Sequence, residues 1–106
     1  MQQSALPQGQ EMINRISHYL EDKPVQKAYL FGSFARGEAD ADSDIDLLVS
    51  LDYSGFVTGL EFFTLWEELE ELTGRKVDLV TENSLSPYVA DRVESDKILI
   101  YEKAQA

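Results

Sequence analysis

The chain has 106 residues, 43% hydrophobic and 27% charged, a composition typical of one globular domain and far from that of disordered chains. Nine Lys and Arg residues face 20 Asp and Glu residues, and the net charge of -11 would repel a phosphate backbone, so no direct nucleic-acid binding is expected. The chain has no cysteine, no secretory signal pattern and no apolar run near the roughly 20 residues that span a bilayer, so we expect a cytoplasmic protein without disulfides or membrane segments.

The first half of the chain predicts a helix followed by two strands. Residues 1–6 are expected to be a loose tail. A helix over 8–21 is predicted from apolar residues at helical spacing, namely Met12, Ile13, Ile16, Tyr19 and Leu20. Residues 25–31 predict a strand, and the turn at Gly32-Ser33 opens a short helix. After an acidic loop, residues 45–51 predict a second, largely buried strand.

The second half predicts helix, strand, helix and strand. A helix over 57–73 ends at Gly74, a typical C-cap residue, and its apolar face is wide enough that Phe63 or Leu60 should stay exposed. A strand over 76–81, a helix over 87–94, a turn at 95–97 and a strand over 97–101 follow. With no repeat or linker, residues 1–106 form a single expected domain: an α/β (α+β) fold whose mixed sheet of about four strands is covered by helices.

Two carboxylates stand at the start of the second strand. Asp44 and Asp46 are separated by one residue, and in a strand this spacing places both side chains on one face. They could bind a metal ion. Taken alone, they fit better with an acidic, solvated loop, since three more carboxylates precede them, at Glu38, Asp40 and Asp42.

A third carboxylate, Asp78, interrupts the apolar strand over 76–81. Burying an unpaired carboxylate is costly, so Asp78 needs a partner. The neighbouring Lys76 could supply one on an exposed strand face. The alternative is a divalent cation shared with Asp44 and Asp46, because three close carboxylates repel one another unless a hard cation neutralises them.

The turn Gly32-Ser33 lies between a strand and a helix, where backbone N–H groups can bind phosphate oxygens. Taken alone, the pair could also be an ordinary strand-to-helix turn with Ser33 as N-cap.

His18 has no second histidine or cysteine near it in sequence, so we expect it at the surface or half-buried, without a catalytic role.

The combination is more specific than its parts. Gly32-Ser33, ten residues and then Asp44-Ile45-Asp46 resemble the signature of the polymerase-β-like nucleotidyltransferases. Residues 30–50, with Arg36-Gly37, are similar throughout to the minimal nucleotidyltransferases (MNT), which are antitoxins of HEPN/MNT toxin-antitoxin pairs. The resemblance extends through the long helix and the third strand to the end of the chain.

The resemblance implies a nucleotidyltransferase with a polymerase-β-like fold. Gly32, Ser33 and Arg36 would bind the nucleotide, and Asp44, Asp46 and Asp78 would be catalytic residues and ligands of two Mg²⁺ ions. The enzyme would transfer AMP from ATP to a tyrosine hydroxyl of a partner HEPN RNase toxin, acting as a protein adenylyltransferase and antitoxin in a hetero-oligomer. Two alternatives stay open: an antitoxin that masks its toxin by contact alone, and a catalytic subunit that modifies small molecules such as aminoglycosides.

Overall fold

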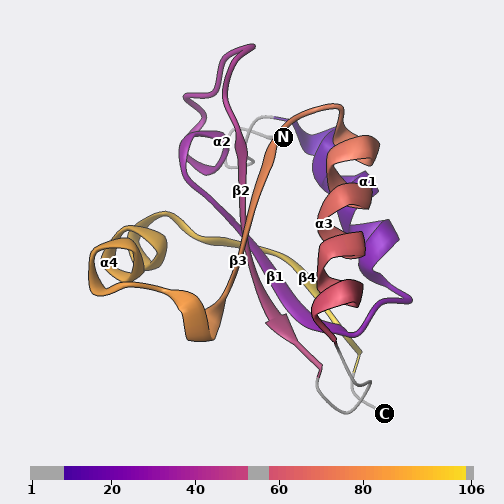
Figure 1. Ribbon diagram of the computed structural model, residues 1–106. Helices are drawn as coiled ribbons and strands as arrows, with labels where there is room; N and C mark the ends of the chain where they lie inside the picture. The colour runs from indigo at the N-terminus through magenta and orange to yellow at the C-terminus, as the bar shows by residue number, and fades with distance from the viewer. Residues whose placement is uncertain (1–8, 53–57, 105–106) are drawn as a thin grey trace.

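The computed structural model describes residues 9–52 and 58–104, so the tail expected at 1–6 lies outside the described residues. Figure 1 shows a central sheet with helices on both sides. The elements follow in the order α1 (Gln10–Leu20), β1 (Val25–Phe31), α2 (Ser33–Arg36), β2 (Ile45–Leu51), α3 (Gly59–Thr73), β3 (Val77–Thr81), the short 3₁₀ helix η3 (Glu82–Ser84), α4 (Pro87–Asp96) and β4 (Ile98–Glu102).

The sheet is mixed, as predicted. Its strand order is β3-β2-β1-β4, and β1 pairs antiparallel with both β2 and β4. β2 and β3 are parallel, with α3 forming the crossover between them. A parallel pair needs such a long crossover, because its second strand must start at the same end of the sheet as the first. The carboxylates that begin β2 and β3 therefore lie at one end of the sheet.

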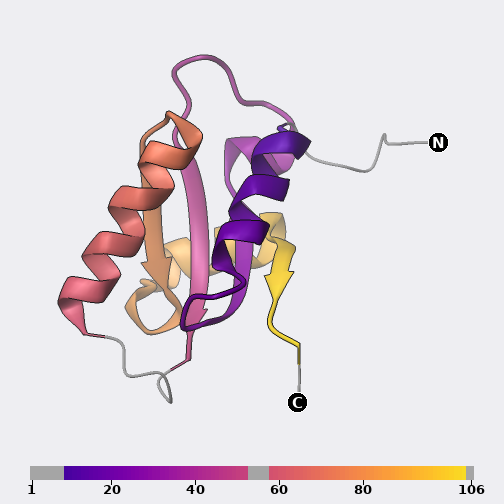
Figure 2. The same cartoon turned by 90° about the vertical axis from the view of Figure 1, so that its right-hand side faces the viewer.

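The two faces of the sheet carry different residues. α1 and α3 cover one face, and α4 lies against the other (Figures 1 and 2). Alternate residues of β2 and β3 point toward α1 and α3 and are buried; they are Ile45, Leu47, Val49, Val77 and Leu79. On the α4 face, a smaller buried cluster joins Phe31, Leu48 and Val93. The apolar core thus lies mainly between the sheet and α1 and α3.

The predicted starts of α1 and α3 were two residues early, whereas α4 begins at Pro87 as predicted. Gly9 has a left-handed conformation (φ 73°), so α1 begins at Gln10 and not at residue 8. α3 begins at Gly59 because Thr58 is its N-cap: the Thr58 hydroxyl accepts a hydrogen bond from the Glu61 N–H, and the Glu61 carboxylate accepts one from the Thr58 N–H. This Thr-x-x-Glu pattern is a capping box, and it could have been found in the sequence.

The turn predicted at 95–97 was wrong. Ser95 and Asp96 complete the last turn of α4, and β4 starts one residue later than predicted, at Ile98. The exposure predictions were right: the side chains of Leu60 and Phe63 are 75% and 57% exposed, and His18 is exposed beside Glu21. In the described parts of the chain, no helix has the length and apolar character needed to cross a membrane.

Candidate active site

Two of the predicted catalytic carboxylates are neighbours in the sheet. Asp46 of β2 and Asp78 of β3 are register partners in a parallel pair, so their side chains point to the same face, about 4.8 Å apart at the backbone. This is the face that α4 covers. Asp78 is exposed and Asp46 half-buried, and among the described residues Lys76 forms no ion pair with Asp78. Asp78 therefore lies beside Asp46, and the alternative that Lys76 neutralises it by an ion pair is wrong.

Asp44 lies directly before β2 and is exposed. The pKa of Asp46 is raised to about 6, mainly because its carboxyl group is partly buried. The negative charges of Asp78 and then Asp44 raise this pKa further. The positive charges of Arg92 and Arg36 act in the opposite direction. In the described part of the chain, none of the three carboxylates makes a hydrogen bond or an ion pair. The negative charges of Asp78 and Asp44 thus act on Asp46, and unpaired carboxylate oxygens are the type of ligand that a hard cation prefers.

Gly32 fits tightly against the Asp46 carboxylate. A Cβ atom at position 32 would lie 2.1 Å from Oδ2 of Asp46, closer than real Cβ contacts, and 3.1 Å from its Cγ, which is also tight. The backbone of Gly32 also has φ 77° and ψ -154°, a conformation essentially restricted to glycine. Glycine is thus required here for two independent reasons, and it lets the strand-to-helix turn touch the carboxylate.

Ser33 is not the N-cap of the short helix. That position belongs to Gly32, and Ser33 is the first residue of α2. The Ser33 carbonyl accepts a hydrogen bond from the N–H of Glu38 at 2.9 Å, while the hydroxyl has no partner among the described residues. The N-cap alternative considered for the Gly-Ser pair is therefore wrong, and the hydroxyl is not used to hold the turn.

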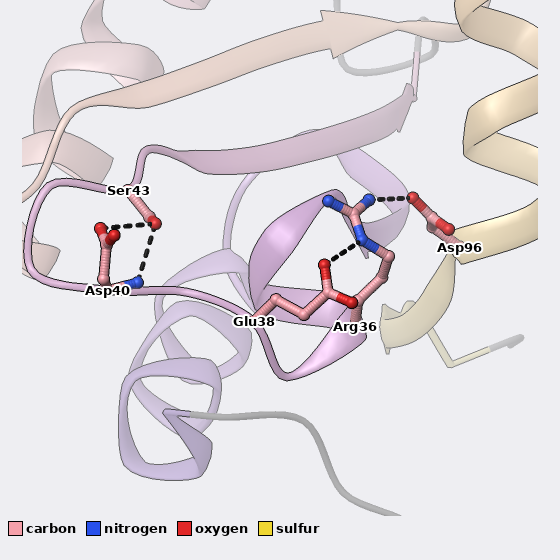
Figure 3. Close-up of polar contacts among 5 residues, drawn as sticks. All are labelled: Arg36, Glu38, Asp40, Ser43 and Asp96. Carbon is pink, nitrogen blue, oxygen red and sulfur yellow. Dashed lines mark hydrogen bonds and ion pairs between the residues drawn. The ribbon is translucent and has the colours of Figure 1, made fainter.

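Arg36 is held by two carboxylates. Its Nε donates to Glu38 at 2.9 Å, and its Nη1 donates to Asp96 at 2.7 Å (Figure 3). These partners raise the pKa of Arg36. The second ion pair joins α2 to the last turn of α4, so Asp96 has a structural role that its reading as part of a turn had missed. Arg36 accordingly steadies the loop beside Gly32, whereas its predicted role in nucleotide binding stays a prediction.

A pocket of about 180 Å³ opens beside these residues. Its lining comes from β1, β2, β3 and α4, and consists of Phe31, Gly32, Asp46, Asp78, Val89, Arg92 and Asp96. Three predicted site residues, Gly32, Asp46 and Asp78, are thus brought together, whereas Ser33, Arg36 and Asp44 do not line this pocket. A larger hollow between α1 and α3, of about 380 Å³, contains none of the predicted site residues.

The loop that leads to Asp44 is braced by an arginine that the sequence reasoning missed. Nη1 of Arg75 donates to the backbone carbonyls of Asp40, Ala41 and Ser43 at 3.1, 3.3 and 3.1 Å. Its guanidinium also stacks over the Phe34 ring. Within the loop, the side chains of Asp40 and Ser43 are hydrogen-bonded at 3.1 Å (Figure 3). A lone arginine after a helix C-cap gives no sequence signal for this role.

The edge strand that carries Asp78 is fixed from α3. Nε1 of Trp66 donates to the Val77 carbonyl at 2.6 Å, and the Val77 N–H donates to Glu70 at 2.9 Å. Both backbone groups of the residue before Asp78 are therefore bonded to side chains of one helix. Helical periodicity placed Trp66 in the core but could not indicate this second function.

The side chains of Asp44, Asp46 and Asp78 are not spaced so as to share one metal ion. Within residues 9–52 and 58–104, no group of three or more His, Cys, Asp or Glu side chains is spaced so as to hold a metal ion. The carboxylate oxygens themselves are the ligands that Mg²⁺ prefers. The metal-ligand roles of Asp44, Asp46 and Asp78 stay a prediction that the chemistry of these residues fits.

Comparison with known proteins shows the family of this chain. Residues 14–106 match the family described as Polymerase beta, Nucleotidyltransferase. A candidate protein adenylyltransferase of Methanocaldococcus jannaschii is 39% identical over 97 residues, covering 90% of this chain and 97% of the relative. The protein adenylyltransferase MntA of Thermococcus cleftensis is 41% identical over 76 residues, covering 72% and 75%.

A solved structure has a similar fold. One chain in the complex of a tri-AMPylated HEPN toxin with its MNT antitoxin, from Shewanella oneidensis, superimposes with a TM-score of 0.66 at 25% identity. The match covers 89% of this chain and 72% of that one. The predicted fold is therefore confirmed.

Proposed function

This chain belongs to the polymerase beta nucleotidyltransferase family, and we propose that it transfers AMP from ATP to a tyrosine hydroxyl of a partner HEPN RNase toxin, acting as its antitoxin. The observation that carries the proposal is the pairing of Asp46 with Asp78 on one face of the sheet, in contact with the Gly32 turn. Nothing among the described residues neutralises these carboxylates by an ion pair. Unpaired carboxylates that repel one another are suited to bind a cation together with the substrate.

Each predicted site residue has a task in this reaction. Asp44, Asp46 and Asp78 would ligate Mg²⁺, which supplies charge neutralisation of the triphosphate and polarisation of the reacting phosphate. Gly32 and Ser33 would place backbone N–H groups and the unused hydroxyl near the phosphates. Arg36 would bind a phosphate, or would steady the turn beside the phosphates through its ion pairs with Glu38 and Asp96.

The bond changes are those of an in-line displacement at phosphorus. The tyrosine oxygen forms a bond to the α-phosphorus, the bond from that phosphorus to the bridging oxygen of the β-phosphate breaks, and pyrophosphate leaves. The phenolic proton passes to a base, for which the exposed Asp78 is the candidate. With a pKa of about 6, Asp46 is mostly ionised at neutral pH and able to bind a cation.

We place the acceptor on another molecule. Residues of α4 line the pocket beside Asp46 together with the strands. The Shewanella oneidensis complex contains a HEPN toxin carrying AMP groups together with an MNT antitoxin. A hetero-oligomer with a HEPN toxin in the cytoplasm is the corresponding proposal for this chain.

The test is a labelling reaction with the full chain, Mg²⁺, ATP radiolabelled at the α-phosphate and a HEPN protein from the same genome. We expect label on the HEPN protein, lost when the partner tyrosine is changed to Phe or when Mg²⁺ is chelated. The double variant Asp44→Ala and Asp46→Ala should lower labelling at least about 100-fold, because side chains that would ligate the metal directly matter at least as much as the residues that orient them.

A matched double variant, Glu67→Ala and Glu71→Ala, removes two exposed carboxylates from α3 and should label like wild type. Absence of label on the HEPN protein with all components present would refute the proposal. If the Asp44→Ala, Asp46→Ala chain still neutralised the toxin in cells, contact alone would account for its antitoxin action.

A further inference from the structure

One arginine in the pocket has no assigned task. Arg92 lies on α4 and lines the pocket together with Gly32, Asp46 and Asp78. Val89, Arg92 and Asp96 follow at three- and four-residue intervals, so they form one stripe of α4, and this stripe faces the carboxylates. Arg92, in the middle of this stripe, is exposed on the side of the helix that borders the pocket.

The two arginines near the carboxylates differ in how they are used. Arg36 already donates to Glu38 and Asp96. Arg92 is exposed and, within the described part of the chain, makes no ion pair or hydrogen bond. All its donors are therefore available to a ligand. An arginine that borders a group of carboxylates without pairing to any of them is placed for an anion that enters the same pocket.

Charge and shape define that anion. Carboxylates line the pocket on the sheet side and attract cations, so an anion enters only together with a cation that neutralises them. A nucleoside triphosphate with its bound divalent ion has this character. The planar guanidinium matches two phosphate oxygens with two parallel hydrogen bonds, a geometry that lysine does not provide.

We propose that Arg92 binds the phosphate groups of the nucleoside triphosphate, opposite the Gly32 turn across the pocket. The inference rests on the proposed AMP transfer and adds a substrate-binding residue to it from α4. The triphosphate is then held between the β1–α2 turn and α4, two segments 60 residues apart in sequence that the Arg36–Asp96 ion pair already joins.

The inference is tested by binding of a non-hydrolysable ATP analogue with Mg²⁺, measured by calorimetry, beside binding of adenosine. Arg92→Ala should weaken the affinity for the ATP analogue about 10- to 100-fold, the range expected for loss of charge-assisted hydrogen bonds, and leave adenosine binding unchanged. Arg92→Lys should recover part of the loss. Arg15→Ala removes an exposed arginine from α1, on the opposite side of the sheet, and should bind like wild type.

Circular dichroism and the melting temperature of each variant check that folding is unchanged, which is expected because Arg92 has no internal partner. If Arg92→Ala binds the ATP analogue as tightly as wild type while wild type labels its partner, the inference fails and the proposed function stands. If the wild-type chain does not bind the ATP analogue, both are wrong. Equal losses for adenosine and the ATP analogue would also overturn the role in phosphate binding.

Discussion

The two faces of the sheet solve opposite problems. On the face covered by α1 and α3, the neighbouring strands β2 and β3 present buried aliphatic side chains such as Leu47 and Val77. The facing helix α3 adds the fully buried Leu69. On the α4 side, the same two strands present Asp46 and Asp78 next to each other, with no ion-pair partner among the described residues. Burial of the aliphatic side chains on the first face stabilises the fold. On the second face, the unpaired carboxylates reduce that stability, because Asp46 is half-buried and repelled by its neighbours.

This difference is built into consecutive residues. Ile45, Asp46 and Leu47 alternate between the two faces, so consecutive residues of β2 belong to the core, the site and the core again. A one-residue shift of β2 would exchange the two sets of side chains. The bonds from Trp66 and Glu70 to Val77, next to Asp78, are therefore as important to the site as to the core, because they hold the register of the edge strand.

The largest effect on stability is expected on the α1 and α3 face. Leu69→Ala removes a fully buried side chain from α3 and should lower the free energy of unfolding by about 2–5 kcal/mol. Leu60→Ala makes the same change on the same helix at a position that is 75% exposed, and should cost less than about 0.5 kcal/mol. Urea unfolding measures both. Similar losses in the two variants would contradict the asymmetry of α3.

The next largest effect is expected where the site touches the turn. Gly32→Ala places a Cβ 2.1 Å from the Asp46 carboxylate and strains a glycine-type backbone, so the free energy of unfolding should fall by about 1–3 kcal/mol. Labelling of the partner should fall as well, because Asp46 must move. Gly37→Ala is the control: its backbone also has positive φ (73°), but a Cβ there meets nothing within 4 Å. If labelling falls equally in both variants, backbone strain and not the Asp46 contact is responsible.

A smaller effect is expected at the brace of the loop. Arg75→Ala removes three hydrogen bonds to backbone carbonyls and should lower stability by about 1 kcal/mol. Because the loop ends at Asp44, amide hydrogen exchange over residues 38–44 should accelerate, and more Mg²⁺ should be needed for labelling. Lys76→Ala, at the exposed neighbouring residue, should change neither property. Unchanged exchange in the Arg75→Ala loop would show that the brace is dispensable.

The smallest effect is expected in the pH dependence of stability, to which Asp46 on the α4 face contributes. The pKa of Asp46 is raised to about 6 in the folded chain, above the value of about 3.9 for an unperturbed Asp, so the folded state holds more protons between these values. Stability contributed by protonated Asp46 is present at low pH and is lost as the pH rises through about 6. Asp46→Asn should therefore melt a few degrees higher than wild type at pH 7.5, with a smaller difference at pH 4. A difference that does not change with pH would contradict the raised pKa.

Local patterns in the sequence determined much of this protein. Helical spacing, apolar strand-length runs and glycine positions predicted each major helix and strand with errors of one or two residues at most ends, and the Gly-Ser and Asp-x-Asp spacing indicated the family. These signals are readable because backbone periodicity and glycine conformation act over a few neighbouring residues. Even the missed start of α3 was present locally, in the Thr58 and Glu61 capping box.

Only the tertiary structure decided which distant residues meet. The parallel register of β2 and β3 places Asp78 beside Asp46, Arg75 reaches the loop before Asp44 from 32 to 35 positions away in sequence, and Asp96 meets Arg36 across 60 residues. Single side chains that cross the fold leave no periodic trace in the sequence, because their partners are set by how whole elements pack. The same packing leaves Arg92 beside the carboxylates without an internal partner, which no reading of α4 alone could have shown.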